Sequence, residues 1–362
     1  MTPSATVQRR QYRVLIVDDS ALHRAAIAGM LGDDPDLVVI GFATNGRDAI
    51  RAAARLKPDV ITIDLRMPIM DGVEASKRIM EETPTPIVMV TASVACDSEQ
   101  LALQAIEAGI LTIIKKPGSV GHDLPAQREL VRTVKRMAAI KVVRHRLHDR
   151  LRTDEDATWS GVRSRTTSAP QLVAIGASTG GPQVLLEVLG MLPSDFPVPV
   201  VVVQHIAPGF VVSLIEWLRS QCALPVEVAE PGRILPRSGI VIADSNRHLT
   251  VRGGELTLTN EPPVSGHRPS ATVLFQSVAR QYGAAAVGIL LTGMGDDGAA
   301  GLRDMKRVGA TTIAQDEASS VVFGMPAVAI GLGVVDHVLP PDDIGRLLIE
   351  LVVTGKSERP DG

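Results

Sequence analysis

The sequence predicts two consecutive α/β domains, each built on a doubly wound parallel sheet. Short runs rich in valine and isoleucine alternate with amphipathic segments in two separate stretches of the chain, and this alternation is typical of βα units around a parallel sheet. The chain has 362 residues, which is the length expected of two domains. Its hydrophobic content of 45% is enough to fill two cores.

The first predicted domain spans residues 11–135. Its strands are expected to be short, and helical segments such as SALHRAAIAGML (20–31) should separate them, because their apolar residues recur at helical spacing. The five predicted strands are YRVLIVDD (12–19), LVVIGFA (37–43), DVITID (59–64), PIVMVTA (86–92) and LTIIKK (111–116).

A linker is predicted at residues 136–170. Its first half is basic with a helical pattern, and its second half is rich in serine, threonine, glycine and charged residues. The basic part has two interpretations, a solvated helix face or a helix that docks or signals between the domains.

The second predicted domain spans residues 171–355. The segment HLTVRGGELTLTN (248–260) has a glycine pair between two alternating runs, which predicts a β-hairpin insert. The other predicted strands are LVAIGAS (172–178), VPVVVVQHI (198–206), GIVIAD (239–244), AVGILLTGM (286–294) and TTIAQ (311–315).

Composition argues against several classes of protein. A net charge of -3 and an aromatic content of 2% argue against nucleic-acid binding. Two cysteines, Cys96 and Cys222, are too few for a disulfide framework or a zinc site. The segment MTPSATVQRRQY has no apolar stretch typical of a signal peptide, and no apolar run is long enough for membrane insertion. We therefore expect a soluble cytoplasmic protein.

Polar residues end four strands of the first domain. Asp18 and Asp19 end the first strand, Asp64 the third, Thr91 the fourth and Lys116 the fifth. In an open parallel sheet these ends meet at one edge, where ligands bind. Clustered carboxylates repel one another, and Mg²⁺ would relieve the repulsion. A carboxylate there could accept a phosphoryl group, with Lys116 neutralising it and Thr91 donating a hydrogen bond. Helix capping plus surface charge is the alternative interpretation.

This first domain resembles the receiver domain of two-component response regulators. The motifs VLIVDDS, IDLRMPIMDG, VMVTAS and KKP match in order and spacing. The resemblance implies a flavodoxin-like fold, and Asp64 as phosphoacceptor for a sensor histidine kinase. It also implies that Asp18, Asp19, Asp64 and the Arg66 carbonyl surround Mg²⁺. Receivers usually carry an aromatic switch residue three positions before the lysine, where this sequence has Ile113.

The stretch LVAIGASTGGPQVLLEVL (172–189) allows two interpretations. Gly176, Gly180 and Gly181 could let a backbone approach a dinucleotide. The same turn fits G-x-S-x-G, with Ser178 as a nucleophile. A dinucleotide site needs a carboxylate at the end of the next strand, which instead ends in Gln204 and His205. The histidine favours a hydrolase, because a serine nucleophile needs a base with a pKa near neutrality.

A third strand of the second domain supplies candidate acids. The turn after AVGILLTGM carries Asp296 and Asp297, either of which could fix the imidazole of His205. Backbone N–H groups near Thr179 and Met294 could form an oxyanion hole. Each residue also has a structural alternative, such as a helix cap for either aspartate or a buried structural histidine.

The second domain resembles the catalytic domain of the chemotaxis protein-glutamate methylesterase family, CheB. The segments AIGASTGGP, VVVQHIAPGF, SGHRPSATVLF, LLTGMGDDGAAG and FGMPAVAIGLG carry the resemblance. It implies Ser178 as nucleophile, His205 as base, Asp297 as acid and Met294 at the oxyanion hole. The HRPS segment (267–270) matches near the family's active site without an assigned role, and VIADSNRH (241–248) departs from the family pattern.

Together the two resemblances imply an esterase activated by phosphorylation. It would hydrolyse γ-glutamyl methyl esters on methylated chemoreceptors, release methanol without a cofactor, and also deamidate glutamines. The unphosphorylated receiver is expected to restrain the catalytic domain. Two alternatives stay open from the sequence, a receiver-controlled hydrolase of another ester or amide in a non-motility pathway, and a nucleotide sensor.

Overall fold

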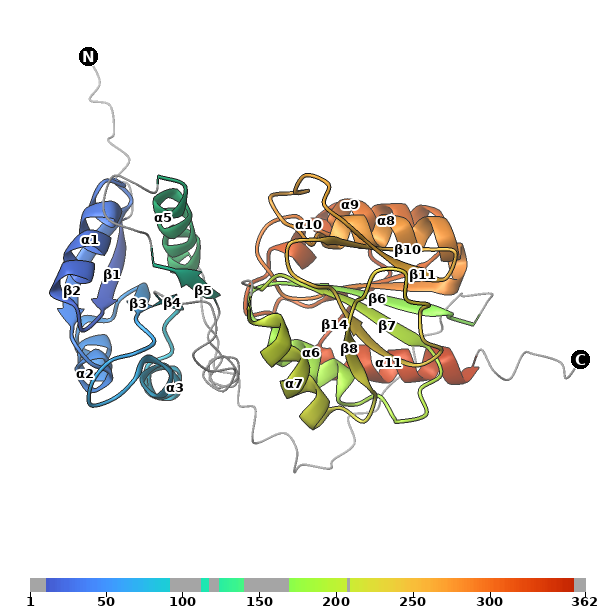
Figure 1. Cartoon of the computed structure of the whole chain (residues 1–362), viewed down its shortest axis with the longest axis horizontal. Helices are drawn as coiled ribbons and strands as arrows, with labels where there is room; N and C mark the ends of the chain where they lie inside the picture. The colour runs from blue at the N-terminus through green and yellow to red at the C-terminus, as the bar shows by residue number, and fades with distance from the viewer. Residues whose placement is uncertain (1–10, 92–111, 117–123, 140–168, 207–208, 355–362) are drawn as a thin grey trace, which may run out of the picture. The chain divides into compact units, whose positions relative to one another are not determined.

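The chain forms two compact units (Figure 1). They comprise Met1–His145 and Arg146–Gly362. The structure, a computed structural model, describes residues 11–91, 112–116, 124–139, 169–206 and 209–354. Most of the predicted linker and Cys96 lie outside these residues. Among the described residues, no helix is long and apolar enough to cross a membrane.

The first unit is a five-stranded parallel sheet in the order β2-β1-β3-β4-β5. This is the flavodoxin-like strand order, in which the direction of winding switches between β1 and β3. The predicted α/β class is therefore confirmed for this unit. Its elements are β1 (Tyr12–Val17), α1 (Ala21–Gly32), β2 (Leu37–Ala43), α2 (Gly46–Leu56), β3 (Val60–Ile63), α3 (Gly72–Glu82), β4 (Ile87–Thr91), β5 (Thr112–Lys115) and α5 (Leu124–Ala138).

Local sequence sets where the helices of the first unit begin. Ser20, Asn45 and Asp71 precede α1, α2 and α3, and each side chain accepts a hydrogen bond from a backbone N–H of the first turn. Such caps satisfy donors that a helix start leaves unpaired. Between the helices, the central strands β1 and β3 are buried, and Leu15 and Ile61 are fully inaccessible. The polar residues that follow these strands are thereby held at one edge of a rigid sheet.

The second unit is a seven-stranded parallel sheet in the order β14-β13-β12-β6-β7-β9-β8. Its winding reverses between β6 and β12, so the ends of these two strands flank the crevice where ligands bind in such sheets. Its elements are β6 (Leu172–Ala177), α6 (Gly181–Leu189), β7 (Pro199–Gln204), α7 (Val211–Gln221), β8 (Val226–Val228), β9 (Gly239–Ile242), β10 (His248–Arg252), β11 (Glu255–Thr259), α8 (Ala271–Tyr282), η2 (Gly283–Ala285), β12 (Ala286–Leu290), α9 (Ala299–Arg307), β13 (Thr311–Gln315), α10 (Met325–Gly331), β14 (His337–Leu339) and α11 (Pro341–Thr354).

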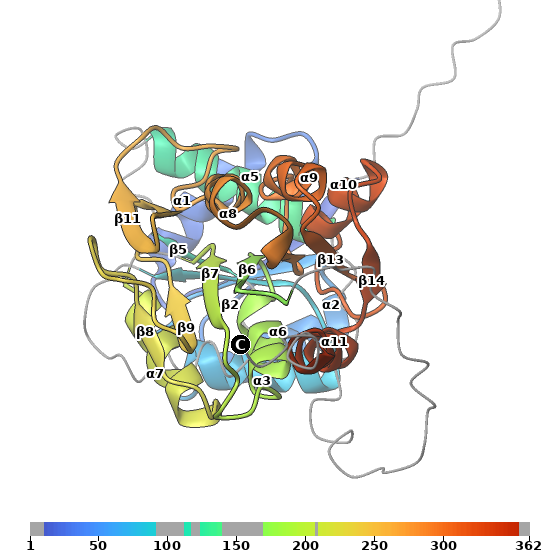
Figure 2. The ribbon, with the colours of Figure 1, turned by 90° about the vertical axis from the view of Figure 1, so that its right-hand side faces the viewer.

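Helices cover both faces of this sheet. Helices α8, α9 and α10 lie on one face, and α6, α7 and α11 lie on the other (Figures 1 and 2). The predicted hairpin is present as the antiparallel pair β10–β11. It packs on α8, where Leu249 and Leu256 join Phe275 in one buried cluster. The Val251 N–H also donates to Ser277 Oγ (3.0 Å). The hairpin therefore holds α8 against the sheet.

Two short strands of the second sheet were not predicted. β8 and β14 are the two edge strands of the sheet, and each has three residues. Three residues are too few to show an alternating pattern, and His337 interrupts the apolar character of β14. Tertiary pairing with β9 and β13, rather than local sequence, makes these segments strands.

Candidate functional site

Three carboxylates gather where the winding of the first sheet reverses. Oxygen atoms of Asp18, Asp19 and Asp64 lie within 4.8 Å of one another. Asp18 and Asp64 are buried and Asp19 is exposed. A cluster of hard oxygen donors with one side open to solvent fits Mg²⁺, which keeps part of its water shell. These residues therefore could hold the cation that the sequence predicts.

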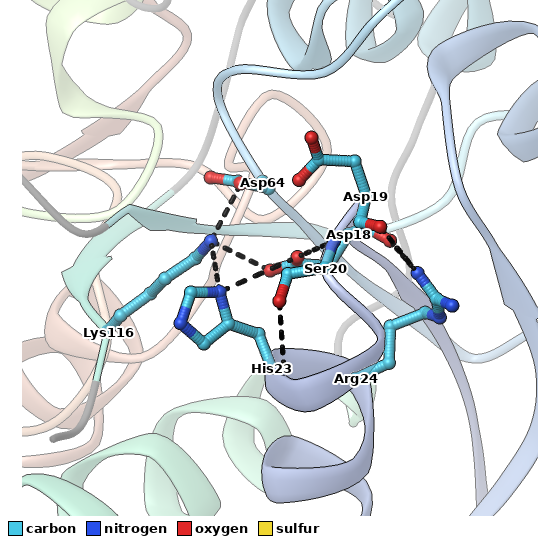
Figure 3. A network of polar contacts seen from close by, with 7 residues as sticks. All are labelled: Asp18, Asp19, Ser20, His23, Arg24, Asp64 and Lys116. Carbon is cyan, nitrogen blue, oxygen red and sulfur yellow. Dashed lines mark hydrogen bonds and ion pairs between the residues drawn. The ribbon is translucent and has the colours of Figure 1, made fainter. Parts of the chain in front are cut away.

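Lys116 compensates the charge of this cluster. Its Nζ lies 2.8 Å from Asp18 Oδ2 and 2.7 Å from Asp64 Oδ2 (Figure 3). Burial alone would lower the pKa of Lys116, but its bonds to the two carboxylates outweigh burial and raise that pKa. Burial raises the pKa of Asp64, and the ammonium only partly offsets this effect. Asp64 thus has a carboxylate in a site with little solvent, next to a permanent cation.

The other residues predicted for this edge lie around the cluster. Thr91 is the buried last residue of β4, and its carbonyl accepts a hydrogen bond from the Lys116 N–H (2.7 Å). Arg66 is exposed in the loop between β3 and α3, two residues after Asp64. The backbone of Ile113 pairs with Met89 in β4, and the Ile113 side chain lies outside the described atoms.

In the second unit, Ser178 sits in the turn between β6 and α6. Its N–H donates to Thr292 O (3.0 Å), beyond the end of β12, and its carbonyl accepts from the Gly181 N–H (2.8 Å). Gly180 has φ +77°, and a Cβ there would lie 2.6 Å from Val321. The turn therefore depends on glycine, both for its left-handed backbone and for its close packing.

Gln204 joins the turn of Ser178 to the turn of His205. Its Nε2 donates to both Ser178 O and His205 O, each at 2.8 Å. The His205 N–H also donates to Ala177 O (2.9 Å). A Cβ at Gly181 would overlap the Gln204 amide oxygen, so glycine lets α6 start against this amide. The serine and the histidine are thus fixed at the ends of neighbouring strands.

The carboxylate of Asp297 accepts hydrogen bonds from four donors and is fully buried. Oδ2 accepts from His205 Nε2 (2.9 Å) and the Ala271 N–H (2.7 Å). Oδ1 accepts from Ser270 Oγ (2.6 Å) and the Thr272 N–H (3.1 Å). Burial alone would raise the pKa of Asp297, but His205, Ser270 and the α8 N-terminus outweigh burial and hold that pKa well below its usual range.

The structure distinguishes the two aspartates that the sequence offered. Asp297 bonds to His205, whereas Asp296 is exposed and its carbonyl accepts from the Ala299 N–H (3.2 Å) at the start of α9. Asp296 therefore belongs to the helix start and Asp297 to the cluster around the histidine.

The two residues predicted to line an oxyanion hole, Thr179 and Met294, keep backbone N–H groups without an acceptor in the described part of the chain. The N–H of Ser178 is already used by Thr292. The loop after Thr292 is held by bonds from the Gly293 N–H to Val322 O (3.0 Å) and from the Gly324 N–H to Gly293 O (3.1 Å). Free donors on rigid turns are what an oxyanion hole requires.

The His205 ring has one nitrogen available for chemistry. Its Nδ1 is buried and has no hydrogen-bond partner in the described residues, while Nε2 bonds to Asp297. One face of the ring stacks on His267, with centroids 3.9 Å apart and planes 4° from parallel. Asp297 and His267 together fix the position and the plane of the imidazole.

Sequence reasoning missed three contributors to this site. The strand pattern marks Gln204 only as a position without a carboxylate, and the HRPS segment indicates no role for His267 or Ser270. Ser270 does have a local signal, since a serine directly before an apolar-periodic segment predicts a helix cap, and its side chain caps α8. Nothing in the local sequence indicates that the same hydroxyl also donates to Asp297.

Two family profiles match the chain, one for each unit. The profile described as "CheB methylesterase" matches residues 173–348, and the profile described as "Response regulator receiver domain" matches residues 14–124.

Known proteins resemble nearly the whole chain. A protein-glutamate methylesterase/protein-glutamine glutaminase of Geobacter metallireducens is 44% identical over 94% of this chain and 99% of its own length. One from Anaeromyxobacter dehalogenans is 45% identical over 94% of this chain and 97% of its own length. The crystal structure of the Thermotoga maritima CheB methylesterase catalytic domain aligns over 51% of this chain and all of its own, with 40% identity and a TM-score of 0.49.

We predict that Asp297 makes the second unit sensitive to acid. Because its folded pKa lies below the unfolded value of about 3.9, it stabilises the fold above that value, and the stabilisation is lost as pH falls from about 4. Asp297→Asn should lower the free energy of unfolding at pH 7 by at least about 2 kcal/mol, since four donors lose an ionised acceptor. It should also flatten the acid dependence. Urea unfolding between pH 7 and pH 3 measures both.

Asp296→Asn is the matched control, because it makes the same chemical change on an exposed neighbour. It should change the free energy of unfolding by less than about 0.5 kcal/mol. If the two variants showed the same acid dependence, the buried hydrogen bonds would not explain the low pKa.

Proposed function

The chain belongs to the CheB methylesterase family, and from that premise we propose that it is a receiver-controlled protein-glutamate methylesterase that also acts as a protein-glutamine glutaminase. Its substrates are γ-glutamyl methyl esters on methylated chemoreceptors, with glutamine side chains as the amide counterpart. The observation that carries the esterase proposal is the bond from His205 Nε2 to the buried, ionised Asp297. This bond fixes the orientation of the His205 imidazole, which follows the strand next to the one that precedes Ser178.

In the proposed reaction, Ser178 Oγ attacks the ester carbonyl and its proton passes to His205. The nitrogen that receives the proton is Nδ1, because Nε2 is occupied by Asp297. The oxyanion of the tetrahedral intermediate accepts from the N–H groups of Thr179 and Met294. Asp297 stays ionised throughout, because its pKa is far below neutrality, and it stabilises the imidazolium.

Collapse of the intermediate breaks the ester bond. His205 returns its proton to the leaving oxygen, and methanol departs while the acyl group stays on Ser178. Water then attacks the acyl carbonyl while His205 takes a proton from that water. The bond between Ser178 Oγ and the acyl carbon breaks, His205 returns the proton to Oγ, and the glutamate carboxyl group is released. With a glutamine substrate the same steps release ammonia.

The receiver supplies control through Asp64. We propose that a sensor histidine kinase phosphorylates this carboxylate and thereby raises esterase activity. Mg²⁺ held by Asp18, Asp19, Asp64 and the Arg66 carbonyl would neutralise charge on the incoming phosphoryl group. Lys116 would form an ion pair with the phosphoryl group, and the Thr91 hydroxyl would donate a hydrogen bond to one phosphoryl oxygen. The cluster of three carboxylates around one ammonium supports this assignment.

We predict that Ser178→Ala lowers methanol release from methylated receptors by at least about 10³-fold, and that His205→Gln has a similar effect. The double variant should release methanol no more slowly than the slower of the two single variants, because members of a triad act as a unit. Methanol release from labelled receptor membranes measures all three rates. Ser220→Ala, on the exposed end of α7, is the control and should leave the rate unchanged.

We predict that a small-molecule phosphodonor with Mg²⁺ raises the methanol-release rate of the full chain, and that Asp64→Asn removes this response. The amide cannot form an acyl phosphate, and Asp64 lies outside the esterase site, so basal turnover should persist. The comparison is the rate of each protein with and without donor. A normal response in Asp64→Asn would contradict the assignment of the phosphoacceptor.

A further inference from the structure

His23 lies inside the charged cluster of the first unit, although no role has been assigned to it. Its Nδ1 is 3.3 Å from Lys116 Nζ and 3.7 Å from Asp18 Oδ1 (Figure 3). An ammonium group has three hydrogens and no acceptor. Nδ1 therefore acts as the acceptor in its contact with Lys116. Lys116 thus has three partners for its three hydrogens, Asp18, Asp64 and His23.

The first turn of α1 holds His23 in this position. The His23 N–H donates to Ser20 Oγ, the cap of the helix (3.4 Å). Arg24 Nη1 donates to the carbonyls of Asp18 (2.6 Å) and Asp19 (3.0 Å). The turn is therefore tied to the acidic loop, while the His23 side chain itself is 45% exposed. Because nearly half of this side chain is exposed, packing of the core does not explain its position facing Lys116.

The three partners of Lys116 differ in what else they must do. In the proposed phosphorylation, Asp18 and Asp64 also serve the cation, and one oxygen of Asp64 becomes bonded to phosphorus. His23 has no such second task, and its Nδ1 contacts the Lys116 ammonium without being a carboxylate. Because imidazole accepts without neutralising, it can orient the ammonium while the carboxylates are engaged.

Resting on the proposed function of the receiver, we propose that His23 is a positioning residue that holds the Lys116 ammonium toward the phosphoryl group during transfer to Asp64. In this step an Asp64 oxygen forms a bond to phosphorus as the donor's bond to phosphorus breaks, and the electron pair leaves with the donor. Lys116 donates a hydrogen bond to a phosphoryl oxygen. His23 neither gains nor loses a proton.

The test compares two substitutions of equal shape in the full chain. His23→Asn places Oδ1 where Nδ1 was and keeps the acceptor, whereas His23→Leu has the same outline and no acceptor. Phosphoryl uptake from acetyl phosphate with Mg²⁺ gives the maximal rate constant and the donor concentration at half-maximal rate. His23→Leu should lower the rate constant about 3- to 10-fold, the value of one hydrogen bond. His23→Asn should stay within about 2-fold of the unmodified chain.

A second measurement needs neither metal nor donor. Exchange of the Lys116 ammonium protons with water, followed by NMR, should be faster in His23→Leu than in His23→Asn and the unmodified chain.

Two outcomes would overturn the positioning role. One is uptake in His23→Leu as fast as in the unmodified chain, and the other is an equal loss in both variants, which would indicate a role in helix structure alone. Failure of the proposed function has a different signature, since the unmodified chain would then take up no more phosphoryl group than Asp64→Asn.

Discussion

The buried carboxylate of Asp297 connects three parts of the second unit that are distant in sequence. It follows β12, it accepts the first N–H groups of α8, and it accepts from the histidine that follows β7. A buried charge costs several kcal/mol unless it is fully hydrogen bonded, and here four donors satisfy it. The same four bonds stabilise the fold and orient His205, so the stability of the fold and the proposed catalysis depend on one group.

In the first unit, the ammonium group of Lys116 compensates buried negative charge. The three carboxylates of this unit repel one another, and Lys116 compensates two of them. In both units the central buried carboxylate, Asp64 or Asp297, lies where the direction of winding reverses, between β1 and β3 or between β6 and β12. Residues after adjacent strands converge there, and the rigid sheet keeps them in place.

Sequence reasoning predicted the fold class and the central strands, because long runs of buried β-branched residues carry a strong local signal. It also grouped Ser178, His205 and an aspartate at one sheet edge, because strand ends are visible in the pattern. The geometry of these groups was not predictable in the same way. Local chemistry could not choose between Asp296 and Asp297, since both lie in one glycine-rich turn and only packing against α8 buries the second.

The contributors that sequence reasoning missed act through contacts across the fold. Gln204 bridges two turns, His267 stacks on His205 from a loop, and His23 meets Lys116 across the sheet edge. None of these pairings follows from spacing along the chain. The edge strands β8 and β14 escaped prediction for the same reason, because tertiary pairing defines them.

The central claim is that Asp297 fixes His205 with its proton on Nε2, which leaves Nδ1 to accept the proton of Ser178. The most direct measurement is a long-range ¹H–¹⁵N correlation spectrum of the full chain, labelled with ¹⁵N-histidine, at neutral pH. The His205→Gln variant identifies the His205 signals. The account predicts a protonated Nε2 and an unprotonated Nδ1 in the unmodified chain, and a mixture of tautomers in Asp297→Asn. A proton on Nδ1 of His205 in the unmodified chain would contradict it.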